Sequence, residues 1–160
     1  NKLLRQISET VEKIGDEERR LMDDMLDTMY AAPGIGLAAI QIGVAKRIIV
    51  MDISRDEIKK EPMYFINPII KNRNNEKAKY EEGCLSVPDQ FAEIERPSSC
   101  EIEYLDYDGK KKLLKADGLL ATCIQHEMDH LEGILFIDYL SKLKKSIIIK
   151  KLSKVKRKIF

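Results

Sequence analysis

The sequence predicts an α+β fold in which antiparallel sheets pack around a central helix, with an amphipathic helix near the N-terminus and another helix at the C-terminus. Two observations lead to this prediction. Segments with strand character lie together in the middle of the chain, whereas helical periodicity is found near its start and in its last third. Segregated helices and strands favour an α+β over an α/β architecture. With 160 residues, the chain has the length of one domain, residues 1–160.

The first helix is expected over residues 16–30. Its apolar residues are spaced so that they share one helical face, and they are Leu21, Met22, Met25, Leu26 and Met29. Three acidic residues open the segment, where the helix dipole favours negative charge. Pro33 and Gly34 follow and end the helix.

Strand character dominates the middle of the chain. Residues rich in β-branched and other apolar side chains predict strands at 47–53, 63–71 and 77–85. Residues 100–104 then alternate apolar and acidic side chains, and a second run follows at 110–115 after Asp108-Gly109. This pair is typical of an antiparallel hairpin with a tight turn.

Two more helices are expected after the hairpin. Asp117 can cap a helix that runs to about Leu131, with Gly133 as its C-terminal stop. The last helix begins near Ser141 and is basic, since residues 141–160 contain nine Lys or Arg and no acidic residue. Residues 1–140 keep 19 basic and 27 acidic residues, a net charge of −8.

Composition places the chain among ordinary globular proteins. It contains 44% hydrophobic and 34% charged residues, without a long apolar run or a low-complexity stretch, which excludes a membrane-spanning or disordered chain. Three cysteines at irregular spacing suit reduced thiols or a metal ligand better than disulfides. No secretion signal follows Asn1. We therefore expect a cytoplasmic protein, and an organellar form stays open.

The strongest local signal is the motif His126-Glu-Met-Asp-His130 inside the helix predicted for residues 117–131. Residues four apart share a helical face and lie about 6 Å apart, so both imidazoles can reach one divalent cation while Glu127 lies beside it. Apolar neighbours indicate that this helix is buried, and buried histidines without partners would be costly. The motif therefore predicts a metal site.

A catalytic site of this kind normally has three protein ligands, so one more is needed. A metzincin protease would place a third histidine where this chain has Phe136, and the chain contains only two histidines. A thermolysin-like protease would use a later glutamate, but the only acidic residue beyond Glu132 is Asp138. A zinc endopeptidase is therefore the less favoured alternative, and the thiolates are the remaining candidates.

Two cysteines are candidates for the third ligand. Cys84, in the segment Glu82-Gly-Cys-Leu-Ser86, is preferred because it ends a predicted strand beside a glycine that allows close approach. Cys123 lies one helical turn before the first histidine and is the alternative, although one helix rarely supplies three ligands to an open site. If Cys123 were a fourth ligand, the site would be closed and structural, as in a binding module. Glu127 argues against that interpretation, because a structural site has no use for an acid beside it.

Three segments together resemble the peptide deformylase family, namely Gly34-Ile-Gly-Leu-Ala-Ala-Ile-Gln41, Glu82-Gly-Cys-Leu-Ser86 and Gln125-His-Glu-Met-Asp-His-Leu-Glu-Gly133. Each is a modest signal alone, but all three in this order and at these separations are very specific. The likeness continues through Ile66-Asn-Pro68 and Ala116-Asp-Gly-Leu-Leu120, so it covers most of the chain. It implies a single catalytic domain that removes the formyl group from the N-terminal formylmethionine of new polypeptides. It also implies that further residues precede Asn1.

The resemblance implies a role for each motif residue. The implied metal ligands are Cys84, His126 and His130, with a water as the fourth. Glu127 would be the general acid and base for attack of that water on the formyl carbon. Gln41 and the backbone N–H of Leu85 would stabilise the oxyanion, each contributing roughly 3 kcal/mol to the transition state.

Substrate contacts are implied as well. The backbone of Ile35 and Gly36 would pair with an extended peptide, a form of strand addition. Ile35, Leu119 and Cys123 would line the pocket for the methionine side chain, and a plain core role for each is the alternative. Bacterial relatives often carry a basic residue a few positions after the Glu-Gly-Cys motif, where this chain has Phe91.

Cofactor and partners complete the expectations. Both zinc and ferrous iron accept cysteine and histidine ligands, and the family implies one divalent ion, Fe2+ in the cell, which Zn2+ or Ni2+ can replace in purified protein. The expected partners are N-formylmethionyl peptides and, through the basic C-terminal helix, ribosomal RNA near the site where new chains emerge. A solvated helix face is the simpler interpretation of that helix. We expect a monomer without membrane contact.

Overall fold

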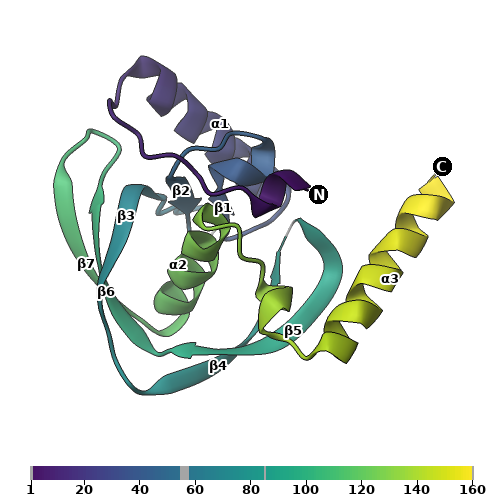
Figure 1. The fold of residues 1–160 in the computed structure, drawn as a ribbon. Helices are drawn as coiled ribbons and strands as arrows, with labels where there is room; N and C mark the ends of the chain where they lie inside the picture. Colours follow the sequence, from purple (N-terminus) through teal and green to yellow (C-terminus); the bar gives the residue numbers. More distant parts are fainter. Residues whose placement is uncertain (1, 55–57, 85, 160) are drawn as a thin grey trace.

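The structure, a computed structural model, describes residues 2–54, 58–84 and 86–159, with side chains as far as residue 152. Its helices are α1 (Asp16–Ala31), α2 (Gly118–Leu131) and α3 (Lys142–Ile159), with short 3-10 helices η1 (Lys2–Arg5), η2 (Ala39–Ile42) and η3 (Phe136–Tyr139). Its strands are β1 (Gly36–Ala38), β2 (Ile48–Met51), β3 (Met63–Arg73), β4 (Lys77–Cys84), β5 (Val87–Pro97), β6 (Ser99–Leu105) and β7 (Lys111–Asp117). Antiparallel sheets surround α2 (Figure 1), so the predicted α+β class is confirmed.

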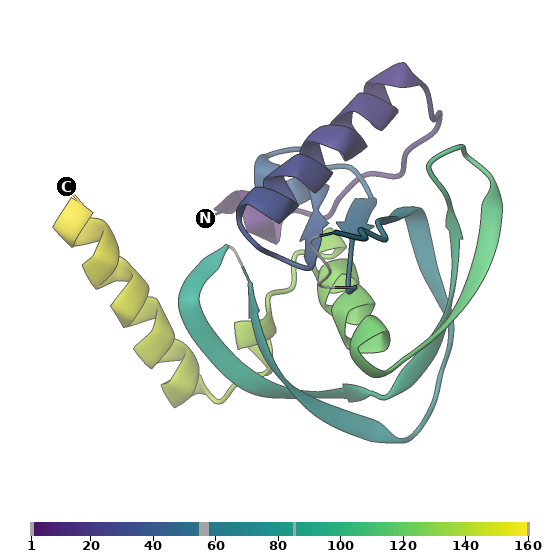
Figure 2. The same cartoon turned by 180° about the vertical axis from the view of Figure 1, so that it is seen from behind.

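The strands form two antiparallel sheets. Five of them pair in the order β1-β2-β3-β6-β7, and β4 pairs with β5 in a separate two-stranded sheet. Within the described residues β1 is an edge strand, because its one partner is β2. Figure 2 shows α1 on the outside of the molecule and α2 inside the curve of the strands. One edge of the larger sheet and the β4-β5 sheet therefore both border the space beside α2.

The strand β2 is buried on both faces, and this explains its continuous apolar sequence. Ile48 and Val50 pack with the methionines of α1, whereas Ile49 and Met51 pack with α2. All four side chains are fully buried. Each fully buried side chain of this size contributes about 1.5–3 kcal/mol to folding, so β2 joins the two main parts of the core.

Most predicted elements agree with the structure to within three residues. The predicted hairpin is present as β6 and β7, with Gly109 at a positive φ of 83° in its turn. The capping role of Asp117 was predicted wrongly. This residue precedes α2, but its side chain makes no capping hydrogen bond, because Asp117 also ends β7 and pairs with Ser99. The strand β5 was not predicted at all.

The glycine that ends α2 is required there for two reasons. Gly133 has a φ of +73°, and a Cβ at this position would lie 2.5 Å from the carbonyl oxygen of Arg5. We expect Gly133→Ala to lower the free energy of unfolding by at least about 1–3 kcal/mol, measured by urea denaturation. Gly15→Ala is the matched control, since nothing lies within 4 Å of its added Cβ. Equal stability of the two variants would contradict this account.

The C-terminal helix α3 extends from the body of the molecule (Figure 1). Its contacts with the rest include Ile148, which is buried in a cluster with Ile94 of β5 and Phe136 of η3, and an ion pair between Lys145 and Asp138 of η3. Leu143 and Ile147 are exposed on the same helix. Among the described residues, no helix is long and apolar enough to cross a membrane.

Candidate metal centre

Two structural elements bring the predicted ligands together. The helix α2 carries His126 and His130 one turn apart, with ring centroids separated by 5.1 Å. Cys84 is the last residue of β4 and faces them from the smaller sheet. One ligand atom from each of these three residues lies within 4.8 Å of the other two. A single cation with bonds of about 2.0–2.3 Å spans such a group after small side-chain rotations.

The polar atoms of this cluster indicate that it suits a metal ion. In the part of the chain that the structure describes, five buried side-chain nitrogen or oxygen atoms lack a hydrogen-bond partner, and four of them belong to His126, Glu127 and His130. Such atoms are costly to bury unless something else binds them. Nitrogen and thiolate donors in a group of three suit Fe2+, Zn2+ or Ni2+. The cluster does not include Cys123, the alternative ligand.

A chain of buried charges orients His126. Its Nδ1 lies 2.9 Å from Oε1 of Glu82, which leaves Nε2 for a metal ion. Arg96 donates two hydrogen bonds to Glu82, from Nε at 2.7 Å and from Nη2 at 2.9 Å, and a third to Asp129 at 2.8 Å. Tyr139 donates to the same Asp129 oxygen. These contacts connect β4, β5, α2 and η3 around His126, one of the predicted metal ligands.

Burial and neighbouring charges give the acidic and basic groups of the cluster different pKa values. Burial alone would lower the pKa of His126, but the neighbouring side chains of Cys84, Glu82 and Glu127 raise it to about 10. Burial, together with the charges of His126 and Arg96, lowers the pKa of His130 to about 3. A cation at the centre would replace the proton on Nε2 of His126, because an imidazole binds a metal ion only in its neutral form. Burial raises the pKa of Glu127 to about 7, near the value that suits proton transfer at neutral pH.

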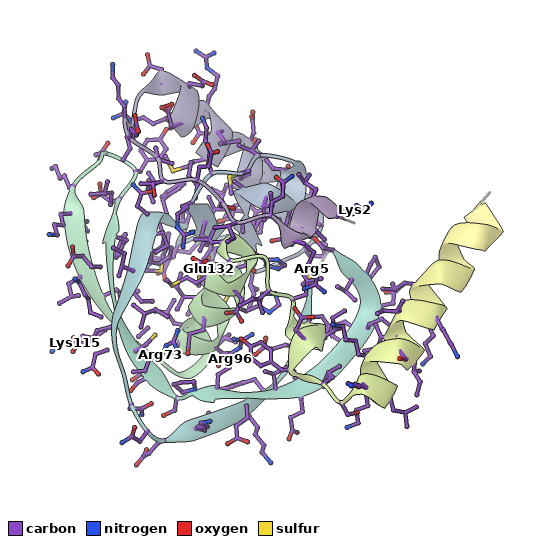
Figure 3. All side chains as sticks on the ribbon, viewed as in Figure 1. Lys2, Arg5, Arg73, Arg96, Lys115 and Glu132 are labelled. Atoms are coloured by element: carbon purple, nitrogen blue, oxygen red, sulfur yellow. The ribbon has the colours of Figure 1, made fainter. Side chains whose placement is uncertain are left out.

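We expect Arg96→Met to weaken metal binding without removing a ligand. Arg96 is only 5% exposed and its side chain lies between α2 and the β4-β5 sheet (Figure 3), so its loss leaves the buried Glu82 and the partly buried Asp129 without this cation. The expected fall in metal affinity is about 10- to 100-fold, measured by chelator competition. Arg73→Met, which changes an exposed arginine of β3, is the control. Unchanged affinity in Arg96→Met would contradict the orienting role.

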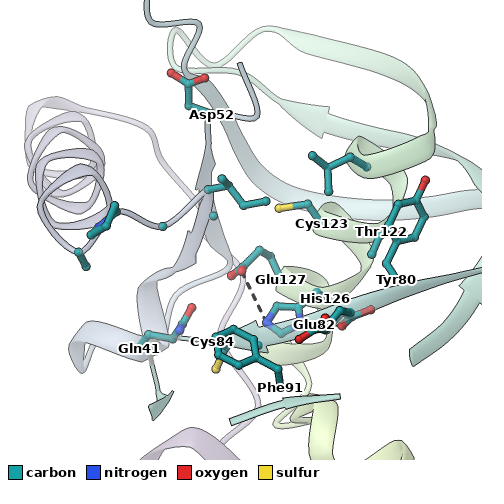
Figure 4. Close-up of a pocket in the computed structure, with 18 of the residues that line it drawn as sticks. Gln41, Asp52, Tyr80, Glu82, Cys84, Phe91, Thr122, Cys123, His126 and Glu127 are labelled. Carbon is teal, nitrogen blue, oxygen red and sulfur yellow. Dashed lines mark hydrogen bonds and ion pairs between the residues drawn. The ribbon is translucent and has the colours of Figure 1, made fainter. Parts of the chain in front are cut away.

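A cavity of about 1170 Å³ opens beside the cluster (Figure 4). The predicted pocket residues Ile35, Gly36, Leu119 and Cys123 all line it. A Cβ at Gly36 would lie 3.0 Å from Sγ of Cys123 and 3.1 Å from Glu127. A larger residue at this position would therefore displace these side chains or increase the distance between β1 and α2.

Gln41 also lines the cavity, and its amide is held in one orientation. Its Oε1 accepts a hydrogen bond from the N–H of Ala38 at 2.9 Å, and its Nε2 donates to Oγ of Ser86 at 3.1 Å. The amide nitrogen of Gln41 therefore points toward Ser86, two residues after Cys84 in the chain. Leu85, the other predicted oxyanion donor, lies outside the described residues.

Sequence reasoning missed several residues of the site. Glu82 and Asp129 belong to motifs but receive no role from the sequence, and Arg96 and Tyr139 belong to no motif. A signal existed for Arg96, because Ala92 and Ile94 alternate with two glutamates, as in a strand, and Arg96 is the next position on the apolar face. Its pairing with Glu82 depends on the β4-β5 register, which the sequence does not state.

Comparisons with known proteins agree on one family. Residues 1–146 match the family described as polypeptide deformylase. The chain is 86% identical to the peptide deformylase of Pelagibacter ubique over 98% of this chain and 91% of that protein, and 56% identical to that of Rhizobium meliloti over 95% and 87%. The crystal structure of the peptide deformylase from Ehrlichia chaffeensis has a TM-score of 0.92 and 45% identity, covering 98% of this chain and 92% of that one.

Proposed function

The chain belongs to the polypeptide deformylase family, and we propose that it removes the N-formyl group from the N-terminal formylmethionine of new polypeptides by metal-dependent hydrolysis. One observation carries the metal dependence: the half-buried Cys84 and the buried His126 and His130 form a three-ligand group beside Glu127 and an open cavity. A metal site with three protein ligands and one coordination position open to water or substrate is typically catalytic rather than structural.

In the proposed reaction Glu127 moves the proton. A divalent cation held at the centre supplies Lewis acidity, which polarises a carbonyl oxygen and makes water more acidic. Glu127 accepts a proton from the water that attacks the formyl carbon. The C–N bond then breaks, and Glu127 returns the proton to the departing amine, which leaves formate and a free N-terminus. Burial raises the pKa of Glu127 above its ordinary value, which favours its role as proton acceptor and donor.

Gln41 is the proposed donor to the oxyanion, together with the backbone N–H of Leu85, which directly follows Cys84 in the chain. We expect Gln41→Ala to lower kcat for formate release by about 10²- to 10³-fold with a smaller change in KM, since an oxyanion donor acts mainly in the transition state. Steady-state kinetics measure the split. Gln6→Ala, at an exposed position, serves as control. A rise in KM alone would assign Gln41 to substrate binding instead.

The substrate is proposed to bind as an extra strand along the free edge of β1. The segment Gly34–Gly36 lines the cavity, and β1 has no second partner strand within the described residues. An extended peptide can therefore form backbone hydrogen bonds there. The methionine side chain would enter the cavity between Ile35, Leu119 and Cys123.

The proposed ion in the cell is Fe2+, with Zn2+ or Ni2+ replacing it in purified protein. The donor set accepts all three, so availability decides occupancy. Metal analysis of protein purified with and without oxygen tests this proposal. Retention of iron after aerobic purification would contradict the expected exchange.

The basic helix α3 is proposed to contact ribosomal RNA. Its segment, residues 141–160, carries nine positive charges and no acidic residue, so it would bind phosphate in a salt-dependent way. Replacement of Lys142, Lys144 and Lys145 by glutamine should weaken co-sedimentation with ribosomes at low salt. Unchanged co-sedimentation would leave only a solvated helix face. The three cysteines of the described residues form no disulfide, which supports a reducing compartment, and we propose a cytoplasmic monomer.

Release of formate from a formyl-Met-Ala peptide by anaerobically prepared, iron-loaded protein tests the proposed function. We expect formate in proportion to bound metal, and none after the metal has been chelated. An inactive, fully loaded protein would overturn the proposal. Cleavage of unformylated internal peptide bonds would then identify the alternative, a zinc endopeptidase.

A further inference from the structure

One buried carboxylate in the wall of the cavity has no part in the proposed reaction. Asp52 directly follows β2 and is only 4% exposed, and Figure 4 shows it well apart from Cys84. The donors that reach it within the described part of the chain are neutral, namely two hydroxyl groups and two backbone N–H groups. A charged group is rarely buried unless such hydrogen bonds hold it in one place.

These donors come from three separate parts of the chain. Oδ2 of Asp52 accepts hydrogen bonds from the hydroxyl of Tyr30, in the last turn of α1, at 2.5 Å and from the N–H of Glu61 at 2.9 Å. Oδ1 accepts from the N–H of Ser54 at 3.0 Å and from its hydroxyl at 2.5 Å. Nζ of Lys60 lies 4.2 Å from the centre of the Tyr30 ring. Burial alone would raise the pKa of Asp52, but these hydrogen bonds lower it, so the carboxylate stays charged at neutral pH.

The backbone of Asp52 holds the start of β1. Its N–H donates to the carbonyl oxygen of Ile35 at 2.9 Å, which continues the β1-β2 pairing by one residue beyond Gly36. The N–H of Gly34 donates to the carbonyl oxygen of Met29, in α1, at 2.9 Å. Along an antiparallel pair, residues bonded to the partner strand alternate with residues whose backbone groups face away from it. Since Ile35 is bonded to β2, Gly36 turns its N–H and carbonyl toward the edge of β1 that has no partner among the described residues.

We propose that Asp52 and Tyr30 are positioning residues, which together hold the start of β1 where the backbone of the substrate adds to it. The proposal rests on the proposed function, in which the peptide pairs with this edge. Asp52 is bonded through its backbone to β1 and through its carboxylate to the end of α1, so it fixes both ends of the short connection between them. Without the Tyr30 hydroxyl one end is released. A misplacement of about 1 Å is enough to disturb the alignment of a bound substrate.

Tyr30→Phe tests the proposal, because it removes the hydroxyl and leaves the ring beside Lys60. With formyl-Met-Ala-Ser we expect KM to rise by about tenfold and kcat to change little, which is the size of one lost hydrogen bond to a charged group. Formyl-Met methylamide lacks the residues that extend along β1, so its kcat/KM should fall far less. Bound metal should equal that of the wild type. Asp52→Asn, which replaces one acceptor oxygen by an amide nitrogen, should affect the two substrates in the same unequal way.

Tyr107→Phe is the matched control, since it removes a hydroxyl bonded to another carboxylate, Oδ2 of Asp23 in α1, at 3.3 Å and at an exposed site. It should leave KM for both substrates at the wild-type value. Binding of the unformylated product Met-Ala-Ser, measured by calorimetry, should weaken by about tenfold in Tyr30→Phe and not in Tyr107→Phe.

Two outcomes would overturn the proposal. The first is a wild-type KM for formyl-Met-Ala-Ser in Tyr30→Phe. The second is an equal loss for formyl-Met-Ala-Ser and formyl-Met methylamide, which would mean that Tyr30 only stabilises the fold. A wild type that releases formate from neither substrate would instead refute the proposed function, and this proposal with it.

Discussion

Replacing Glu127 by glutamine is expected to lower kcat for formate release by about 10²- to 10⁴-fold, the usual contribution of a general acid and base. Glutamine has nearly the same shape, but it cannot accept the proton from water or return one to the amine. The metal ligands are untouched, so the variant should bind one equivalent of metal as the wild type does. Formate release and metal content, measured on the same preparation, separate the loss of proton transfer from the loss of the ion.

Glu127 is buried close to a proposed metal ligand, so its role in proton transfer must be distinguished from a role in metal binding. Its side chain is buried, and Oε1 lies 3.9 Å from Nε2 of His126, which Figure 4 marks with a dashed line. Glu132→Gln is a suitable control, because Glu132 follows the same helix and pairs at the surface with Arg47. Full activity of Glu127→Gln would exclude this residue from proton transfer. Loss of the metal in this variant would instead indicate a structural role.

Cys84→Ser is expected to abolish both metal retention and activity. A serine hydroxyl stays protonated at neutral pH and is a poor ligand for the ions that thiolates bind. The two histidines alone offer too few donors for a stable site. We expect metal content after gel filtration to fall below about one tenth of an equivalent and formate release to become undetectable.

Cys123→Ser is the matched control for this experiment. Cys123 lies on α2 near the same centre, beside Gly36, but it is not part of the three-ligand group. Cys123→Ser should therefore keep its metal. The opposite result, with metal retained in Cys84→Ser and lost in Cys123→Ser, would exchange the roles of the two cysteines.

Much of the fold could be predicted from local patterns. The helix α1 has a regular apolar face and acidic residues in its first turn, and the β6-β7 hairpin has an Asp-Gly turn. The strand β5 was missed because its alternating segment is short and its buried face continues with a charged side chain, whose burial depends on partners far along the chain. Arg96 is the clearest example, since its burial depends on Glu82, which is 14 residues away, and on Asp129, which is 33 residues away.

The candidate site was predictable where spacing along one helix defines it. His126 and His130 are four residues apart, so the helix alone brings them together. The position of Cys84 needed tertiary structure, and elimination of other donors reduced the choice to two cysteines. The hydrogen bond between Glu82 and His126 joins β4 to α2, and the ion pair between Glu82 and Arg96 joins β4 to β5. Such contacts between separate elements have no local signal.

The burial of β2 on both faces has a consequence for how the molecule opens. Ile48, Ile49, Val50 and Met51 belong to two separate apolar clusters, so a local fluctuation that exposes β2 would have to disrupt both. Regions of this kind open only with most of the protein, and their amide protons exchange slowest with solvent. The strand β1, whose other edge is free within the described residues, is hydrogen-bonded directly to β2. A peptide that adds to that edge therefore meets a template that is already ordered, and little backbone entropy of the protein is lost when it binds.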